Sequence, residues 1–364
     1  MKKSNHYIIC AGGTGGHFFP AIATAEFLIQ SGHKVTLLTD KRTANYASKK
    51  HVETIKIIPL INRSFSGNFF QKVISCFFLS IGLLQAFYLL IKLKPHKLIG
   101  FGGYPSFPGI MAGIILNIPI ILHDQNTILG RVNKILGRFA QKIAVSYPID
   151  FMKKLNHFPE HIQKKLIYTG NPIREIFLKT PPNKLKISKT GPIQIFIFGG
   201  SQGARIFSEK IPEQLKNLNS NLKKRIKIIQ QARAEDIKNL EIFYKKEGIF
   251  AKIQPFFDKM ETILQNSHLV IARSGASSIT EICVTKTPAI YIPLPTAKDN
   301  HQFYNAQYVC ENLNAGWLIE QKNLEQSLTP LLEKILLTKT SYSKVADILK
   351  KHRYINSLGR EILC

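Results

Sequence analysis

Short apolar runs alternate with longer helical patterns along most of this chain. Residues 7–11 (YIICA) form the first apolar run, glycines follow it, and AIATAEFLIQSG then has helical character. KVTLLTD is the next apolar run, so this stretch predicts a strand, a tight loop, a helix and a second strand. Strands that alternate with helices in this way indicate parallel sheets with right-handed crossovers.

The same alternation recurs in two series. LIGFGGYPS and IPIILHDQN belong to the first series, and IQIFIFGGSQGAR, HLVIARSGASSITEICV and TPAIYIPLP to the second. Between them, residues 178–192 are rich in Pro, Lys and small polar residues, which predicts a linker. The pattern predicts an α/β protein of two Rossmann-like domains whose parallel sheets face a cleft. Residues 1–172, with a C-terminal helix in 344–364, form the first domain, and residues 173–343 form the second.

Residues 73–91 (VISCFFLSIGLLQAFYLLI) carry no charge and approach the length of about 18–20 residues that a membrane-spanning helix needs. A core helix, a helix partly in contact with a membrane surface and a true span all stay open. Contact with the surface is favoured, because the segment lies between two strands of one predicted sheet. Cations and aromatic residues flank it, as in proteins that rest on anionic lipid: Arg63, Phe65, Phe69, Phe70, Lys72, Lys92, Lys94, His96 and Lys97.

The composition narrows the choice of partner and compartment. A formal net charge of +27 over 364 residues favours an anionic partner. The basic residues are spread along the chain and no nucleic-acid-binding signature is present, so we do not expect nucleic acid as a partner. Five cysteines without a CxxC motif indicate reduced thiols rather than a disulfide framework or a zinc site. The first residues do not have the pattern of a signal peptide.

A glycine-rich loop, GGTGGH, joins the first predicted strand to the first predicted helix. Glycine lets a ligand approach the backbone, and a helix N-terminus offers N–H groups and a positive dipole end to a phosphate. The dinucleotide fingerprint is broken, because Phe18 stands where its third glycine belongs. Asp40 nevertheless ends the next strand, so a dinucleotide-dependent oxidoreductase stays an alternative. The loop is also no P-loop, since no Gly-Lys-Ser/Thr follows.

Seven polar or glycine-rich segments follow one another along the chain: GGTGGH, GFGGYPS, HDQN, GNPIR, GGSQGAR, RSGASSITE and KDNHQFYNA. This ordered set resembles the MurG family of peptidoglycan glycosyltransferases over residues 8–306. The resemblance implies the GT-B architecture and transfer of N-acetylglucosamine from UDP-N-acetylglucosamine to the muramyl 4-hydroxyl of lipid I. The product is lipid II, and the anomeric centre is inverted.

The resemblance also implies the surroundings of the enzyme. It implies a peripheral protein at the cytoplasmic face of the bacterial inner membrane, with an anionic membrane surface and cell-wall and division proteins as further partners. We expect no cofactor and no metal, because the Asp-x-Asp motif of metal-dependent transferases is missing. A GT-B transferase with another lipid acceptor, such as diacylglycerol, and a non-catalytic scaffold are the competing interpretations.

For the donor, the resemblance implies contacts from both domains. Glu281 has a carboxylate that can accept from both ribose hydroxyls, while the amides of Gln302 and Asn305 suit a sugar diol. The alternative for Glu281 is a helix-surface carboxylate, and Arg273 is interpreted as a residue that stabilises its loop. The complete donor set is Thr14, Gly15, Gly16, Asn126, Arg174, Ser201, Phe257, Ala276, Ser277, Ser278, Ile279, Thr280, Glu281, Gln302 and Asn305.

Inverting transfer needs a base for the attacking hydroxyl and stabilisation of the departing diphosphate. His17 stands at a predicted helix start, and Asp124 ends a predicted strand, where doubly wound sheets bind ligands. Both are candidates for the base, although the family usually has glutamate at the position of Asp124. Gly13 and Tyr104 are the implied contacts of the acceptor.

Overall fold

The computed structural model describes residues 4–49, 55–63, 68–200, 203–338 and 340–364. The chain forms two compact units, the first comprising Met1–Arg174 and Ile355–Cys364 and the second Glu175–Tyr354. The main chain therefore passes from one unit to the other after Arg174 and returns after Tyr354. Each unit contains one parallel sheet, as the alternating pattern predicts.

The first unit is built on a seven-stranded parallel sheet of order β3-β2-β1-β4-β5-β6-β7. Strand β1 lies inside the sheet and pairs with β2 on one side and with the central strand β4 on the other. Its residues Ile8 and Ile9 are fully buried, which explains why this run is apolar without alternation. The strands are β1 (His6–Cys10), β2 (Lys34–Thr39), β3 (Lys56–Pro59), β4 (Lys97–Gly100), β5 (Ile120–Asp124), β6 (Lys142–Val145) and β7 (Leu166–Tyr168).

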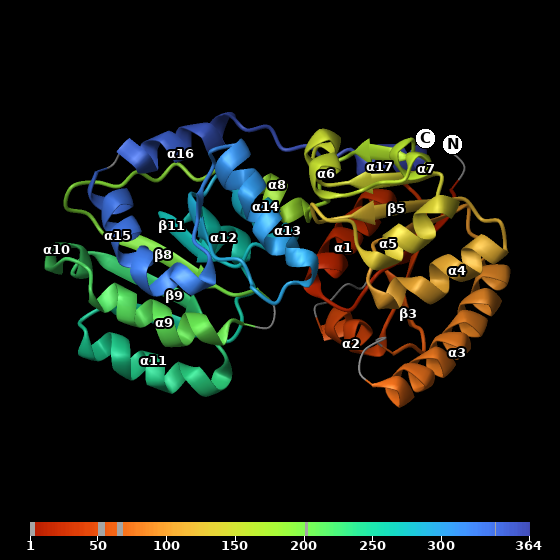
Figure 1. The fold of residues 1–364 in the computed structure, drawn as a ribbon, viewed down its shortest axis with the longest axis horizontal. Helices are drawn as coiled ribbons and strands as arrows, with labels where there is room; N and C mark the ends of the chain where they lie inside the picture. Colours follow the sequence, from red (N-terminus) through yellow and green to blue (C-terminus); the bar gives the residue numbers. More distant parts are fainter. Residues whose placement is uncertain (1–3, 50–54, 64–67, 201–202, 339) are drawn as a thin grey trace. The chain divides into compact units, whose positions relative to one another are not determined.

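Helices cover this sheet, and the last of them comes from the end of the chain (Figure 1). Leu358 and Ile362 of that helix, α17, are fully buried in one hydrophobic cluster with Leu28 of α1. Lys97 donates to the carbonyl of Ile362 at 2.7 Å. The helices are α1 (Gly15–Gln30), α2 (Lys41–Lys49), α3 (Phe69–Leu93), α4 (Phe107–Ile115), α5 (Arg131–Leu136), α6 (Ile149–Leu155), α7 (Glu160–Gln163) and α17 (Leu358–Leu363).

The second unit has a six-stranded parallel sheet of order β10-β9-β8-β11-β12-β13. Its strands are β8 (Ile193–Phe198), β9 (Ile226–Gln231), β10 (Phe250–Gln254), β11 (Leu269–Ala272), β12 (Ala289–Tyr291) and β13 (Trp317–Leu318). Its helices are α8 (Glu175–Lys179), α9 (Arg205–Lys216), α10 (Ser220–Lys223), α11 (Ala234–Lys246), α12 (Met260–Gln265), α13 (Ala276–Val284), α14 (His301–Gln307), α15 (Leu324–Leu337) and α16 (Thr340–Lys351).

The C-terminal residues 344–364 differ from the single helix expected in the first domain. Helix α16 ends at Lys351 within the second unit, and only α17 belongs to the first unit. The break between them is held by a long-range contact, since the Ser357 N–H donates to the carbonyl of Thr169 at 3.0 Å. The last helix is therefore a separate element that returns to the first unit.

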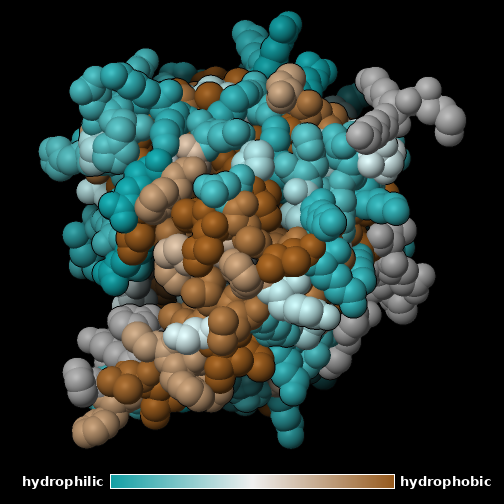
Figure 2. Space-filling view, turned by 90° about the vertical axis from the view of Figure 1, so that its right-hand side faces the viewer, coloured by the Kyte–Doolittle hydropathy of each residue, from teal (hydrophilic) through white to brown (hydrophobic). Residues whose placement is uncertain are grey.

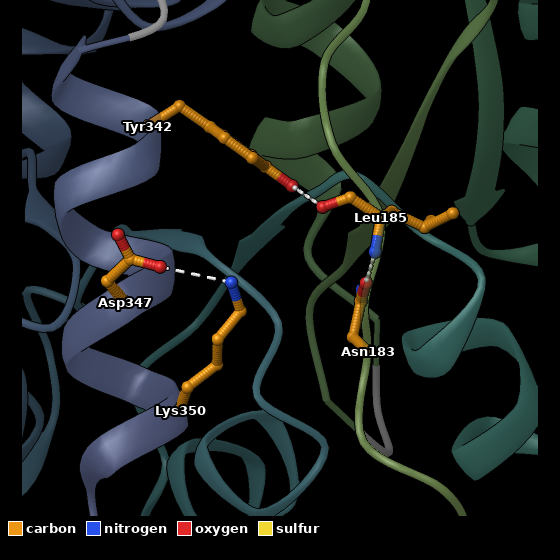
Figure 3. Close-up of polar contacts among 5 residues, drawn as sticks. All are labelled: Asn183, Leu185, Tyr342, Asp347 and Lys350. Atoms are coloured by element: carbon orange, nitrogen blue, oxygen red, sulfur yellow. Dashed lines mark hydrogen bonds and ion pairs between the residues drawn. The ribbon is translucent and has the colours of Figure 1, made fainter.

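The segment predicted as a linker, residues 178–192, lies within the second unit rather than between the units. Asn183 fastens it there: its Nδ2 donates to the carbonyl of Ser267 at 2.7 Å and its Oδ1 accepts from the Leu185 N–H at 2.8 Å. The Tyr342 hydroxyl also reaches the Leu185 carbonyl, at 3.4 Å, from the same helix that carries the Asp347–Lys350 ion pair (Figure 3). The segment with the composition of a linker is thus a surface stretch of the second unit that hydrogen bonds hold in place.

Helix α3 has two apolar faces. The face that carries Ser75, Gly82, Ala86 and Leu90 is buried. The other face exposes a row at helical spacing, and Figure 2 shows hydrophobic residues gathered on this side of the first unit: Phe70, Val73, Ile74, Phe77, Leu84, Tyr88 and Ile91. Among the described residues, one helical stretch, Val73–Leu93, is long and apolar enough to cross a membrane, and 22% of its most apolar window is buried. This exposure argues against a helix that serves only the core.

The predicted rim of cations around this helix is only partly described. Arg63, Lys92 and Lys94 are exposed. Lys97 was expected in the same rim, but it is 8% exposed in β4 and donates to the Ile362 carbonyl, so its inclusion is wrong. Phe65 and the side chains of Phe69 and Lys72 lie outside the described residues.

Candidate functional site

The predicted site loops of the first unit follow β1 and β4, the two neighbouring strands between which the strand order reverses. Cys10 at the end of β1 pairs with Gly100 at the end of β4. The loop with Gly12 and Gly13 and the loop with Gly102 and Gly103 therefore leave the sheet side by side. In doubly wound sheets this reversal point, at the carboxyl ends of the strands, is where ligands bind.

The Gly102–Gly103 turn lies directly against His17. Both glycines have positive φ, +78° and +74°, which disfavours any other residue. A Cβ added at Gly103 would lie 3.2 Å from Cδ2 of His17 and 3.2 Å from the Gly12 carbonyl oxygen. His17 therefore packs directly against the backbone of the Gly102–Gly103 turn, where no side chain intervenes.

Asp40 holds the first glycine loop in place. Its Oδ2 accepts from the Gly13 N–H at 2.9 Å and from the Thr43 hydroxyl at 2.7 Å, while its Oδ1 accepts from the Thr43 N–H. Arg42 donates to the Gly13 carbonyl. The Gly13 N–H is thus already hydrogen-bonded to Asp40. In a dinucleotide-dependent oxidoreductase this carboxylate would bind a ribose, whereas here it holds the glycine loop.

Helix α1 begins at this loop without an acidic residue. Thr14 is its N-cap residue, has extended backbone angles and makes no side-chain capping bond. Gly15 and Gly16 form the first turn, so the positive end of the helix dipole is not offset by a carboxylate there. This arrangement suits a phosphate group.

His17 is half-buried and contacts Gln125, a residue that is not among the predicted site residues. The Nδ1 atom of His17 lies 2.8 Å from Oε1 of Gln125. Gln125 is buried, and its Nε2 lies 3.1 Å from both the Phe101 carbonyl oxygen and Nδ1 of His123. The available signal was its place within HDQN, directly after the candidate base Asp124.

Asp124 ends β5 as a buried carboxylate surrounded by donors. Oδ2 accepts from the Gly130 N–H at 2.7 Å and from Nδ2 of Asn133 at 2.9 Å. Oδ1 accepts from the Asn126 N–H at 3.1 Å. Burial raises the pKa of Asp124, and the bonds from Gly130, Asn126 and Asn133 act against that shift. These contacts make Asp124 the anchor of the loop between β5 and α5.

Two further predicted residues lie near the start of α1. Tyr104 opens the short turn Tyr104–Ser106, and a Cβ added at Gly13 would lie 3.5 Å from its ring. Burial and the nearby Asp40 raise the pKa of Tyr104. The Arg174 guanidinium lies over the ring of Phe19, 4.9 Å from its centroid. The first unit thus brings Gly13, His17 and Tyr104 together, with Arg174 attached to the same helix.

The second unit repeats this arrangement. Phe198 at the end of β8 pairs with Ala272 at the end of β11, where the strand order again reverses. GGSQGAR follows the first of these strands, and RSGASS follows the second. Helices α9 and α13 begin after them with no acidic residue in the first turn and, among the described residues, no side-chain cap. Ser201 lies outside the described residues.

Ser274 links the predicted ribose loop to the predicted sugar loop. Its hydroxyl donates to the Gln302 carbonyl at 2.8 Å, and Nδ2 of Asn305 donates to the Ser274 carbonyl at 3.2 Å. The Gln302 side chain accepts from the Leu294 N–H. The start of α13 therefore lies beside α14, which brings together the predicted residues Ala276, Ser277, Ser278, Ile279, Thr280, Glu281, Gln302 and Asn305.

Several of the candidate side chains in the second unit are buried, among them Asn305 and Glu281. Glu281, on α13, is 8% exposed. Phe257 packs edge-on against Phe196 at 5.7 Å, which is a core contact of the side chain. Arg273 donates to the Ile292 and Pro293 carbonyls and to Gln321. Burial lowers its pKa to about 10, and it acts as the loop-stabilising residue that the sequence suggests. Within the described ranges, no group of three or more His, Cys, Asp or Glu residues forms a metal cluster.

Comparison with known proteins places this geometry in a family. Residues 7–145 match the glycosyltransferase family 28 N-terminal domain, and residues 194–357 match its C-terminal domain. A protein of Rickettsia canadensis is 38% identical, with 100% of both chains covered. It is named UDP-N-acetylglucosamine–N-acetylmuramyl-(pentapeptide) pyrophosphoryl-undecaprenol N-acetylglucosamine transferase. The namesake of Rickettsia felis is 41% identical over 92% of this chain and 90% of its own length. The chain belongs to the MurG family of glycosyltransferases.

Solved structures agree with this assignment. The MurG of Acinetobacter baumannii superposes with a TM-score of 0.75 at 25% identity, covering 99% of this chain and 98% of its own. The glycosyltransferase of kitacinnamycin, at 13% identity and a TM-score of 0.69, shares the fold. The predicted MurG membership and the two-domain α/β architecture are confirmed, and the comparisons do not favour an oxidoreductase.

Proposed function

We propose that this member of the MurG family transfers N-acetylglucosamine from UDP-N-acetylglucosamine to the muramyl 4-hydroxyl of lipid I and so forms lipid II. The observation that carries the proposal is the full-length similarity to the Rickettsia canadensis transferase, at 38% identity over 100% of both chains. The activity that this relative's name describes needs a nucleotide-sugar site and a site for a lipid-linked diphosphate. Both units contain helix starts that suit such anionic groups.

We assign the donor mainly to the second unit. Helices α9 and α13 begin at neighbouring strand ends, so their N-termini are suited to the two phosphates of UDP. Glu281 on α13 would accept from the ribose hydroxyls, and the loop that Ser274 ties to Gln302 and Asn305 would contact the sugar. Thr14, Gly15, Gly16, Asn126 and Arg174 are the proposed donor contacts from the first unit. Gly13 and Tyr104 remain the proposed acceptor contacts.

We assign the role of base to His17 rather than to Asp124. The Asp124 carboxylate already accepts three hydrogen bonds, whereas the His17 ring is half-buried and offers Nε2 after Nδ1 is bound to Gln125. In the proposed step His17 takes the proton of the 4-hydroxyl, whose oxygen bonds to the anomeric carbon. The bond from that carbon to the diphosphate breaks, and its electron pair stays on the β-phosphate oxygen. Helix N-termini and Arg174 would stabilise this leaving group.

We also propose that the exposed face of α3 rests on an anionic membrane at the cytoplasmic side. Phe77 and Leu84 are 64% and 70% exposed on a helix whose opposite face packs inside the unit. A helix that is apolar all round needs a second apolar environment. Exposed Lys92 and Lys94 at its C-terminal end would meet anionic headgroups. The acceptor is itself a membrane lipid, so this orientation would keep the enzyme at its substrate.

The decisive experiment is a transfer assay with labelled UDP-N-acetylglucosamine and a lipid I analogue in the presence of a metal chelator. We expect a labelled product with the mass of the lipid II analogue, formed at least about a hundredfold more slowly by His17→Gln. Diacylglycerol in place of lipid I tests the competing acceptor, and labelling of that lipid instead would overturn the proposal. Loss of all transfer on chelation would refute the metal-independent mechanism alone.

A further inference from the structure

A row of polar contacts leads from His17 into the interior of the first unit. Nδ1 of His17 contacts Oε1 of Gln125, and Nε2 of Gln125 contacts Nδ1 of His123. Nε2 of His123 then contacts the Gly170 carbonyl oxygen at 3.1 Å. Each contact needs one donor and one acceptor, so the row constrains where the protons lie.

The orientation of the Gln125 amide is the first constraint. The Phe101 carbonyl oxygen can only accept, and it lies 3.1 Å from one end of the amide. That end must therefore be the NH₂ group, and the opposite end, facing His17, must be the oxygen. An amide oxygen can only accept, so the atom of His17 that faces it must carry a hydrogen.

The same constraint acts on His123 from both sides. The second N–H of the Gln125 amide points at Nδ1 of His123, so Nδ1 must accept. Nε2 faces the Gly170 carbonyl and must donate. This is a neutral imidazole with its proton on Nε2, in agreement with the burial of His123, which lowers its pKa to about 4.

The inner end of the row is itself fixed by the fold. Gly170 has a φ of +72°, and a side chain there would collide with the Ile355 carbonyl. Its own carbonyl oxygen also accepts from the Thr169 hydroxyl at 3.1 Å. The acceptor for His123 is thus held by the returning C-terminal segment.

We propose that Gln125 is a positioning residue that holds the neutral imidazole of His17 in the Nδ1–H form, so that Nε2 is the atom that receives the proton of the acceptor. The inference rests on the proposed role of His17 as the base. It adds that the identity of the basic nitrogen is set by a buried amide and, through it, by His123. An imidazole protonated on Nε2 could not take the proton at that atom.

The test reads the tautomer directly. The full chain is labelled with ¹⁵N-histidine, and long-range ¹H–¹⁵N correlation spectra are recorded without substrate at a pH where the imidazoles are neutral. His17→Gln and His123→Asn variants assign the signals. We expect His17 in the Nδ1–H form and His123 in the Nε2–H form. A wild-type His17 protonated on Nε2 would overturn the proposal, whether or not the chain makes lipid II.

Variants of Gln125 then test the cause. Gln125→Met removes the acceptor, and we expect His17 to lose its preference for Nδ1–H; Gln125→Glu retains an acceptor and should preserve it. In the transfer assay Gln125→Met should lower kcat about tenfold or more, with an unchanged KM for UDP-N-acetylglucosamine, because a general base contributes roughly 10²–10⁴-fold. Gln163→Met is the matched control, since Gln163 also donates to a backbone carbonyl, that of Phe158 in the same unit.

The outcomes separate the two claims. An unchanged His17 tautomer in Gln125→Met, or a changed tautomer with wild-type kcat, would overturn the role of Gln125. No lipid II from the wild-type chain would refute the proposed function, while the spectra would still decide the tautomer.

Discussion

Gly130 donates its N–H to the Asp124 carboxylate at 2.7 Å, so a buried side chain closes the loop between β5 and α5. We expect Asp124→Asn to lower the free energy of unfolding by about 2 kcal/mol, because an amide cannot accept from all the donors that face this carboxylate. Chemical denaturation measures the change. Asp150→Asn, at an exposed site of the same unit, should alter stability by less than about 0.5 kcal/mol. Equal stabilities of both variants would argue against an anchoring role.

His17→Gln should lower activity and leave stability unchanged, unlike Asp124→Asn. We expect kcat to fall by roughly 10²–10⁴-fold, because the base is lost, while stability and UDP-N-acetylglucosamine affinity stay near wild type. Steady-state transfer, denaturation and calorimetric titration measure the three quantities. His33→Gln replaces another histidine of the first unit and should leave kcat unchanged. Retention of more than a tenth of wild-type kcat in His17→Gln would reject this histidine as the base.

Glu281→Ala should weaken donor binding. Loss of a charged hydrogen-bonding group costs about 1.5–3 kcal/mol, so we expect the Kd for UDP-N-acetylglucosamine to rise about tenfold or more. Glu213→Ala, at an exposed position of α9, is the control. Binding of uridine nucleotides by calorimetry gives the result, and a Kd equal to that of the control would remove Glu281 from the ribose site.

His123 should make the stability of the protein depend on acidity. Burial lowers its folded-state pKa to about 4, below the ordinary histidine value of 6.5. The folded state therefore binds this proton less readily than the unfolded state, and the stabilisation is complete above pH 6.5. It is lost as the pH falls from 6.5 towards 4, by roughly 3 kcal/mol in total. The difference between wild type and His123→Asn, followed by denaturation across this range, isolates the effect; a difference independent of pH would contradict it.

The double substitution Phe77→Ser and Leu84→Ser should release the protein from lipid. Both side chains are exposed on α3, and each contributes apolar area to the row that we propose to rest on the membrane. Co-sedimentation with anionic vesicles should fall at least tenfold, while Ile242→Ser with Phe250→Ser, at exposed positions of the second unit, should bind like wild type. Equal sedimentation of the two double variants would exclude α3 as the docking face.

The alternation of apolar runs and helical patterns predicted both sheets, because strands buried on two faces must be continuously apolar. It also placed the glycine loops at strand ends, where the order of strands reverses. Lys97 shows the limit of such local reasoning. Its position beside an apolar helix suggests a surface cation, whereas its partner is the Ile362 carbonyl at the far end of the sequence.

Gln125 lies in the predicted site motif HDQN, but the sequence did not predict its role. The motif HDQN drew attention to its charged neighbour, since a carboxylate is the more familiar base. The function of the amide depends on the Phe101 carbonyl and on His123, whose own partner Gly170 lies on another strand end. Contacts of this kind arise from the fold, and the spacing of residues within a motif does not predict them.

The first unit can be produced on its own only if it includes residues 355–364, because the chain returns to it there. A gene fragment ending at Arg174 would encode a domain whose α1 lacks the buried partners Leu358 and Ile362. Such a fragment would expose apolar surface and aggregate. A circularly permuted version, with residues 355–364 placed ahead of β1 through a short flexible joint, would supply the missing helix and give a soluble form of the first unit for separate study.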